Sequence, residues 1–575
     1  MVFTLGTFVF FTALVAVISW YLTKDDDLKT ESGYFLGGRS LSATVIAGSM
    51  MLTNLSTEQM VGLNAQGFKS GLAVIAWESG ASIGIVILAI YFLPKYLQGS
   101  ITTVPEFLEE RYDKSVRNIV SIFFLLTLGI AFLPTVLYSG SIAMMKLFDI
   151  PGIFGISQES AIVLSVWLIG IIGSIYAIFG GLKAVAVSDT VNGVGLVIGG
   201  LAIPVLGFIY LGDGSMLKGM EYIFQHAPEK LNTIGGKDSQ APFGAAITGM
   251  RITALYYWCT NQAIIQRALG AKSLKEGQKG VLLTALLKIV VAPLILVVPG
   301  IIAYCIYGNE IGGGIVYPTL VNKLLPTYMT GFFGAVLFGA VLSSFNSALN
   351  SASTIFSLNI YKPLFKPEAS EEYLIKISKY FGTILAVFSM IVAPFISKSS
   401  GGLFEFIQKV AGLFSVPIAI IVLVGIFSRK ASALAAKISM GFFVIVYGYT
   451  QFIGSFKLHF LYVVAILFVI CLIIIYVVDK IIPPKKEYSL PVRYEVPIEP
   501  WEYRYTVSVI LMALLVYIYV IFSKLGILYD GEFIKMRASI ITLIFIVITG
   551  LICTWTRKIE KIVNNKNRVY CKTLQ

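Results

Sequence analysis

The chain has 575 residues, of which 57% are hydrophobic and only 13% are charged, and its mean hydropathy is +0.83. Soluble domains carry about 25% charged residues, so this composition excludes a soluble enzyme, a disordered chain and a fibrous protein. The net charge of +13 comes from basic residues in loops between apolar stretches, which indicates membrane topology and not nucleic-acid binding. Four of the five cysteines lie inside apolar stretches and there are only two histidines, so we expect no disulfide framework and no zinc or haem site. The composition predicts a polytopic, all-α membrane protein.

Fifteen stretches are long and apolar enough to cross a bilayer, whose hydrocarbon core of about 30 Å requires about 20 helical residues. They are residues 3–22, 41–65, 72–94, 119–145, 160–179, 186–211, 243–266, 280–306, 330–360, 377–397, 402–427, 434–452, 458–478, 505–523 and 538–556. The first stretch has no small-residue cleavage site and is followed by Asp25–Asp27, so it is expected to be a retained helix and not a signal peptide.

The distribution of Lys and Arg predicts the orientation. If the N-terminus lies outside, the loops after odd-numbered stretches and the C-terminal tail hold about 30 of the 44 basic residues, the excess expected of cytoplasmic loops. We therefore expect a multi-pass protein of the cell membrane with a cytoplasmic C-terminus. The basic segments 267–279, 362–379, 480–504 and 557–572 would face the cytoplasm and attract anionic lipid.

Polar residues cluster in the middle of the second stretch, where lipid would normally exclude them. The cluster consists of Thr53, Asn54, Ser56, Thr57, Glu58 and Gln59. Such a cluster predicts a helix that unwinds near the bilayer midplane and offers backbone carbonyls to an ion or a substrate. The alternative is an intact helix whose polar groups are satisfied by neighbouring helices.

Glu78 and Lys288 are single charges in two other stretches. Burying either alone costs several kcal/mol, so each is expected to have a partner or water. A carboxylate and an ammonium in one wet cavity could hold a polyhydroxylated neutral molecule, because the first accepts and the second donates hydrogen bonds. A structural ion pair that contacts no ligand is the alternative.

The stretch 330–360 carries small and hydroxyl residues on one helical face. These are Ala340, Ser343, Ser344, Ser347 and Ser351. The pattern is typical of close helix packing. It is equally compatible with a sodium site, because sodium is a hard cation that is coordinated by oxygen atoms. Asp189 could be either a helix N-terminal charge or a functional carboxylate.

The stretches divide into two five-helix units, 41–211 and 243–427, each beginning with a polar, interruptible helix. An odd number of helices per unit inverts the second relative to the first, as in transporters that work by alternating access. Residues 1–40 would form a first helix and a loop, and residues 428–575 would form peripheral helices and a basic tail. The sequence contains no P-loop, which disfavours an ATP-driven pump.

Several runs carry a resemblance to a known family over about residues 30–480. They are residues 54–59 (NLSTEQ), 176–182 (YAIFGGL), 255–258 (LYYW), 261–262 (NQ), 264–267 (IIQR), Lys288, 299–300 (PG), 341–344 (VLSS) and 404–408 (FEFIQ). The chain resembles the sodium:solute symporter family and, within it, the sodium/glucose group, most closely its bacterial sodium/galactose members.

The resemblance implies a LeuT-like fold of inverted five-helix repeats with flanking helices, which binds one sodium ion and one sugar near its centre. It implies that sodium is held by the carbonyls of Leu52, Leu55 and Ala340 and by the hydroxyls of Ser343 and Ser344. Asp189 would lie on the exit path of the ion.

For the sugar, the resemblance implies hydroxyl contacts from Gln59, Glu78, Lys288 and Gln408. An inner aromatic gate would be Tyr257, with Asn54 holding its hydroxyl, and an outer gate would be Leu63, Trp77 and Phe404. Ala254, Ala81 and Trp77 replace the asparagine, serine and tyrosine of the galactose members, so the identity of the hexose stays open.

The expected function is sodium-coupled symport of a neutral sugar, galactose or glucose, into the cell. The expected partners are the sugar, sodium and the lipid bilayer, with no nucleic acid and no obligatory protein partner. Alternatives are the same fold acting on inositol, sialic acid or an amino acid, and a sugar sensor that transports nothing. A membrane enzyme is not expected, because no catalytic cluster is evident.

Overall fold

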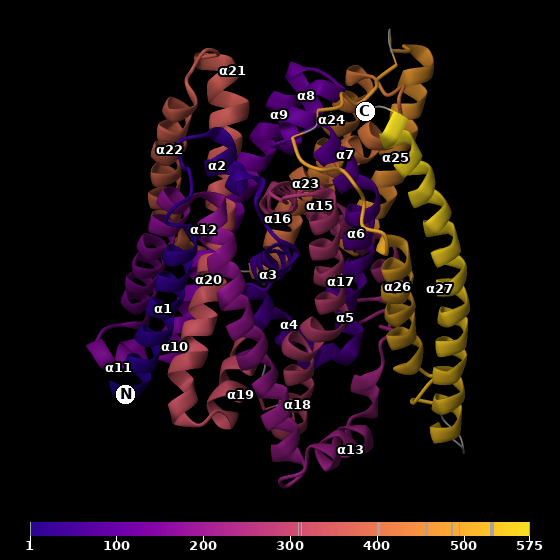
Figure 1. Cartoon of the computed structure of the whole chain (residues 1–575). Coiled ribbons are helices and arrows are strands. Elements are labelled where there is room, and N and C mark those ends of the chain that lie inside the picture. The colour runs from indigo at the N-terminus through magenta and orange to yellow at the C-terminus, as the bar shows by residue number, and fades with distance from the viewer. Residues whose placement is uncertain are drawn as a thin grey trace.

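The computed structural model describes residues 2–308, 310–311, 313–398, 403–454, 458–484, 487–493, 495–529 and 534–573. The side chains of residues 2, 58, 314, 327–328, 397–398, 403–408 and 565–573 lie outside this description. Regular structure in the described ranges is helical, and the one β-type contact there is an isolated bridge between Leu41 and Ala271. The helices run roughly parallel to one another between two ends of the molecule (Figure 1).

Twelve helices of the described ranges are long and apolar enough to cross a membrane, against the fifteen stretches expected. The difference arises at three places. The 54-residue helix α12 (Gln158–Leu211) contains two of the expected stretches, separated by the non-helical Gly181. As one straight helix it would be about 80 Å long, far more than a bilayer requires. The stretches 41–65 and 243–266 are each interrupted, so their pieces are shorter than a membrane span.

The segment expected to be the first repeat, residues 41–211, opens with the interrupted pair α3 (Ala43–Asn54) and α4 (Thr57–Ser70). Its remaining membrane helices are α5 (Ile75–Glu78), α6 (Ser82–Ile87), α7 (Leu93–Gln98), α9 (Lys114–Leu125), α10 (Leu133–Leu147) and α12, with the short helices η3 (Ser79–Ala81), α8 (Val104–Arg111) and α11 (Ile150–Phe154) between them. α13 (Met216–His226) follows α12, and α14 (Phe243–Ile247) begins the segment 243–427 that was expected to be the second repeat.

The segment expected to be the second repeat contains a second interrupted pair, α15 (Gly249–Cys259) and α16 (Gln262–Leu269). It continues through α17 (Leu274–Leu296), α18 (Val298–Tyr307), α19 (Val316–Leu324), α20 (Thr327–Ile355), α21 (Lys362–Phe365), α22 (Glu371–Val392) and α23 (Leu403–Phe427). The flanking helices are α1 (Val2–Thr23), α2 (Glu31–Leu36), α24 (Ala433–Gly448), α25 (Phe460–Ile481), α26 (Arg504–Ile521) and α27 (Ile534–Thr573).

Both interruptions occur where the sequence supplies residues suited to start a new helix. α3 ends because the Ser56 N–H donates to the Asn54 carbonyl (2.9 Å) instead of to the Leu52 carbonyl four residues back, and Ser56 then adopts an extended conformation before α4. α16 begins directly after its N-cap Asn261, whose side chain accepts a hydrogen bond from the Ala263 N–H (3.0 Å). Asparagine is favoured at the N-cap because its side-chain oxygen accepts from a free backbone N–H of the first turn, whereas the Ser56 side chain makes no such bond.

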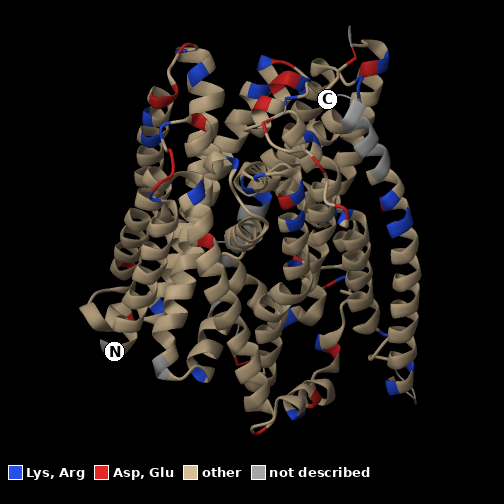
Figure 2. Ribbon diagram, viewed as in Figure 1, with Lys and Arg blue, Asp and Glu red and all other residues tan. Residues whose placement is uncertain are grey.

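Burial separates the centre of the molecule from its edge. The most apolar part of the α20 region is 94% buried, whereas that of α27 is 0% buried. α27 lies along the outside of α26 at one edge (Figure 1). Charged residues gather mainly at the two ends of the helices, which leaves an apolar belt between them (Figure 2).

Candidate functional site

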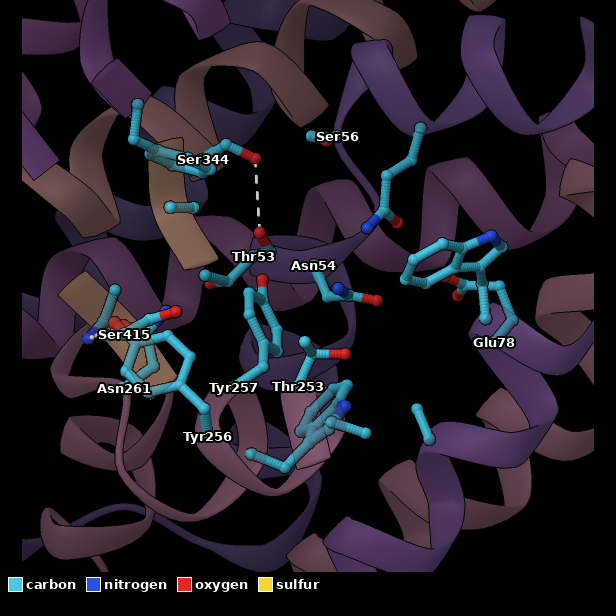
Figure 3. A pocket seen from close by; sticks show the side chains of 18 of the residues that line it. Thr53, Asn54, Ser56, Glu78, Thr253, Tyr256, Tyr257, Asn261, Ser344 and Ser415 are labelled. Carbon is cyan, nitrogen blue, oxygen red and sulfur yellow. Dashed lines mark hydrogen bonds between the residues drawn. The ribbon is translucent and has the colours of Figure 1, made fainter. Parts of the chain in front are cut away.

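A cavity of about 180 Å³ lies between the two helix interruptions. Its walls come from α3, α4, α5, α15, α17 and α20, with further contributions from the α9–α10 region and from α23. Thr53 and Asn54 from the first interruption and Tyr257 and Asn261 from the second lie close together around it (Figure 3). The two polar stretches identified in the sequence therefore form one site.

Lys288 is the central cation of this cavity. Its ammonium group donates to the Glu78 carboxylate and to the Asn54 side-chain oxygen, and all three side chains are buried. The same ammonium lies 5.6 Å from the centre of the Trp258 ring, a favourable cation–π arrangement. The two charges expected to need partners thus pair with each other at the cavity wall, which offsets the cost of burying each alone.

Hydrogen-bonding capacity remains next to this pair. The Gln59 side-chain oxygen is buried and makes no hydrogen bond to a described residue. Gln59 and Ser56 line the cavity from the segment that follows the α3 interruption. An unsatisfied buried acceptor costs free energy unless water or a ligand reaches it, so this wall is suited to a polar guest.

The positions expected to hold sodium lie on α3, directly after it and on α20, two helices that contact each other. Leu52, Leu55, Ala340, Ser343 and Ser344 are all buried, and the Ser344 hydroxyl donates to the Thr53 carbonyl across the α3–α20 contact (3.3 Å). The Ser343 hydroxyl is buried and lies close to the Asp189 carboxylate. Hydroxyl and carbonyl oxygens without negative charge suit a monovalent hard cation.

Asp189 lies deeper, on α12, and is 1% exposed. Its carboxylate accepts from the Ser49 hydroxyl (2.7 Å) and lies 3.8 Å from the Arg267 guanidinium. Arg267 is 0% exposed, although it begins one of the basic segments expected to face the cytoplasm. The sequence did not indicate that Arg267 is buried, because this residue adjoins the basic loop that follows α16.

The other expected site residues divide into two groups. Leu63, Trp77 and Tyr257 line the cavity, as do Ala81 and Ala254. Phe404 and Gln408 belong to α23, but their side chains lie outside the described ones, so their expected contacts stay predictions.

Four further residues with hydroxyl groups line the cavity, and the sequence analysis did not predict them: Thr127, Thr135, Thr253 and Ser415. The hydroxyl of Thr127 donates to the Phe123 carbonyl (2.8 Å), and that of Thr135 donates to the Ala131 carbonyl (2.7 Å). Because an isolated threonine in a membrane helix can satisfy itself in this way, its presence in a sequence carries no signal for a site.

Comparisons with known proteins bear on this site. A model of the sodium:solute symporter family matches residues 34–442. The uncharacterized symporter YidK of Escherichia coli (strain K12) is 45% identical over 541 residues, which cover 94% of each chain. The sodium/glucose cotransporter of Vibrio parahaemolyticus is 30% identical over 75% of this chain and 82% of its own. The sodium/myo-inositol cotransporter 2 of Bos taurus is 30% identical over 79% of this chain and 69% of its own.

The fold has a match among solved structures. A Na+-coupled sialic acid symporter in a substrate-bound outward-open state superimposes with a TM-score of 0.72 and 21% identity, over 84% of this chain and 99% of the other. This match confirms the expected LeuT-like fold. The family and the structural neighbours are transporters and not enzymes. The chain is therefore a multi-pass membrane transporter that belongs to the sodium:solute symporter family.

Proposed function

We propose that this transporter couples the inward movement of a neutral sugar, galactose or glucose, to the inward movement of sodium. The observation that carries the proposal is the buried group of Glu78, Lys288 and Asn54 at the cavity wall, with the unpartnered Gln59 oxygen nearby. A sugar hydroxyl both donates and accepts hydrogen bonds, so neighbouring hydroxyls can bind to a carboxylate, an ammonium and an amide at once.

The chemistry of the wall favours a neutral solute over a carboxylated one. Among the described residues, Lys288 is the cation that lines the cavity, and it is already paired with the Glu78 carboxylate. A carboxylated solute such as sialic acid would meet the Glu78 carboxylate without a free cation to offset the repulsion. Inositol is a ring of hydroxyls without a carboxylate, and it remains the second candidate because a named myo-inositol cotransporter is among the relatives.

Sodium would bind to the carbonyls of Leu52, Leu55 and Ala340 and to the hydroxyls of Ser343 and Ser344. Their burial and the Ser344–Thr53 hydrogen bond support this assignment, since α3 and α20 lie close enough to share one ion. Sodium bound there would stabilise the α3 interruption that also lines the solute cavity, and this shared segment provides the coupling between the two ligands.

Purified protein in liposomes with an inward sodium gradient tests the function directly. We expect labelled galactose or glucose to accumulate inside, and we expect accumulation to stop when potassium replaces sodium. Labelled myo-inositol, sialic acid and an amino acid belong in the same panel. Accumulation of one of these and of neither hexose would contradict the sugar assignment, and equal uptake in potassium would contradict sodium coupling.

A further inference from the structure

Arg251 on α15 is a cation inside an apolar stretch, and neither solute binding nor sodium binding explains it. Its side chain is partly buried and does not line the cavity, although other residues of α15 do. Nε donates to the Ala246 carbonyl (2.7 Å), and Nη2 donates to the Ala76 carbonyl (2.5 Å). The guanidinium group therefore links two backbone segments that are distant in the chain.

Both carbonyls belong to short helices. Ala246 lies in α14, and Ala76 lies in α5, which is four residues long. α5 lies between two 3₁₀ turns, η2 (Gly71–Val74) and η3 (Ser79–Ala81). A single helical turn between 3₁₀ turns has few good backbone hydrogen bonds of its own, and a cation near a helix end can donate to carbonyls that lack a partner. The hydrogen bond from Arg251 therefore helps to hold α5 in place.

Gly80 makes room for this guanidinium group. A Cβ added at Gly80 would lie 2.5 Å from Arg251 Cζ and closer still to both Nη atoms. The φ of Gly80 is not in the left-handed region, so the backbone conformation at this position does not require glycine. The absence of a side chain at Gly80 therefore serves the contact with Arg251.

The segment that Arg251 holds forms part of the cavity wall. The two residues that follow Ala76 are Trp77 and Glu78, and both line the cavity. Tyr257 lines it from α15, less than two helical turns beyond Arg251 (Figure 3). The hydrogen bond to Ala76 therefore joins the wall that carries Glu78 to the helix that carries Tyr257.

We propose that Arg251 is a positioning residue of the solute site, which holds α5 against α15 so that Glu78 and Tyr257 bind the same solute molecule. The inference rests on the proposed solute site. Without Arg251, α5 keeps the contact of the Ser79 hydroxyl with the Ile289 carbonyl of α17 (3.2 Å), so the wall persists but its separation from α15 is no longer fixed. A displacement of about 1 Å is enough to weaken a site.

Hexose uptake into liposomes, measured separately from sodium binding, tests this role. We expect Arg251→Met, which removes both hydrogen bonds, to raise the half-saturating concentration of labelled galactose or glucose about tenfold, the change that about 1.4 kcal/mol produces. The maximal uptake rate per folded transporter should not change. Sodium binding without solute should also stay at the wild-type value, because the hydrogen bonds of Arg251 reach neither α3 nor α20.

Arg251→Lys keeps the charge but offers one ammonium group in place of the planar fork, so it should recover part of the hexose affinity. Wild-type hexose affinity in Arg251→Met would overturn the proposal. An equal loss of hexose binding and sodium binding would also overturn it, because that result indicates general damage to the fold.

Gly80→Ala tests the contact without removing Arg251. Its methyl group would displace the guanidinium group, so this variant should lose hexose affinity as Arg251→Met does, and it decides the question if Arg251→Met does not fold. In an Arg251→Ala background the space is free. Adding Gly80→Ala there should change neither the hexose affinity nor the thermal unfolding temperature further. Additive effects at the two positions would overturn the proposal.

Arg111→Met is the matched control. Arg111 is also buried and also donates to backbone carbonyls, three of them at the C-terminal end of α23 and just beyond it, away from α5. This variant should lower the unfolding temperature and keep the wild-type hexose affinity. An equal loss of hexose affinity in Arg111→Met and Arg251→Met would overturn the proposal.

The unfolding measurements separate this inference from the proposed sugar transport. They need no solute, so they test the contact between Gly80 and Arg251 whichever solute is transported. Absence of hexose uptake by wild type would contradict the sugar assignment alone, and the variants would then be compared on the panel solute that accumulates.

Discussion

Glu78 is the residue whose replacement separates a solute site from a structural ion pair. Glu78→Gln keeps the shape of the side chain but removes the charge that faces Lys288. If Glu78 accepts hydrogen bonds from solute hydroxyls, we expect the affinity for the solute to fall by about 1.5–3 kcal/mol, as for hydrogen bonds to charged groups. Sodium-dependent solute binding to the detergent-purified variant measures this change.

Glu560→Gln is the control for Glu78→Gln. Glu560 is also fully buried and accepts from the backbone N–H groups of Tyr505 and Thr506 at the start of α26, far along the chain from the cavity residues. Glu560→Gln should lower the stability of the protein and leave its affinity for the solute unchanged. Wild-type affinity in folded Glu78→Gln would mean that the Glu78–Lys288 pair is structural.

Ser344 provides a second prediction for a single residue. Ser344→Ala removes a proposed sodium ligand, so the sodium concentration for half-maximal uptake should rise about tenfold, corresponding to one lost oxygen contact of about 1.4 kcal/mol. Ser351→Ala is the control on the same helix, because its hydroxyl donates to the Gln266 side chain (2.9 Å) and is not a proposed ligand. If both variants show the sodium dependence of wild type, Ser344 does not bind sodium.

At the scale of whole elements, Gly181 explains how α12 accommodates two membrane stretches. Its φ of 63° and ψ of −173° lie in a region that only glycine adopts readily, and an added Cβ would lie 3.0 Å from the Tyr34 carbonyl oxygen. We expect Gly181→Ala to destabilise the protein by about 1–3 kcal/mol and to lower its thermal unfolding temperature in detergent.

Gly441 on α24 is the matched glycine for this test. A Cβ there meets nothing within 4 Å and the backbone is helical, so Gly441→Ala should leave the unfolding temperature unchanged or raise it slightly. Equal unfolding temperatures for Gly181→Ala and wild type would show that α12 tolerates a different geometry at this position.

The helix interruptions could be predicted from the sequence, whereas the pairing of their side chains could not. Polar residues at 53–59 are so costly in lipid that they indicate a broken helix without any tertiary information. The partner of Lys288, by contrast, is 210 residues away, and no local pattern links Glu78 to it. The resemblance to a family supplied that link.

Arg267 shows the opposite case. Its sequence position, at the end of a membrane stretch and next to Lys272, is typical of a cytoplasmic loop. Only the packing of α16 against α3 and α20 buries it. Residues at the boundary between helix and loop are therefore where charge patterns are least informative, because tertiary contacts decide whether the side chain reaches water.

At the scale of the whole molecule, the two termini lie at opposite ends of the helices (Figure 1). This placement agrees with an odd number of membrane crossings, as the fifteen expected stretches require. The excess of Lys and Arg in the loops after odd-numbered stretches predicts that the end with α2 and α21 faces the cytoplasm, since basic residues are retained on that side.

Cysteine labelling in intact cells tests this orientation. Lys218 on α13 and Lys366 just after α21 are both exposed and lie at opposite ends of the molecule (Figure 1). In a background without the five native cysteines, Lys218→Cys should react with a membrane-impermeant maleimide in intact cells, because α13 would face outward. Lys366→Cys should react only after the membrane is permeabilised. The reverse labelling pattern would mean that the end with α21 faces outward. Sodium would then enter the protein from that end, driven by a membrane potential of 100 mV that contributes about 2.3 kcal/mol per charge.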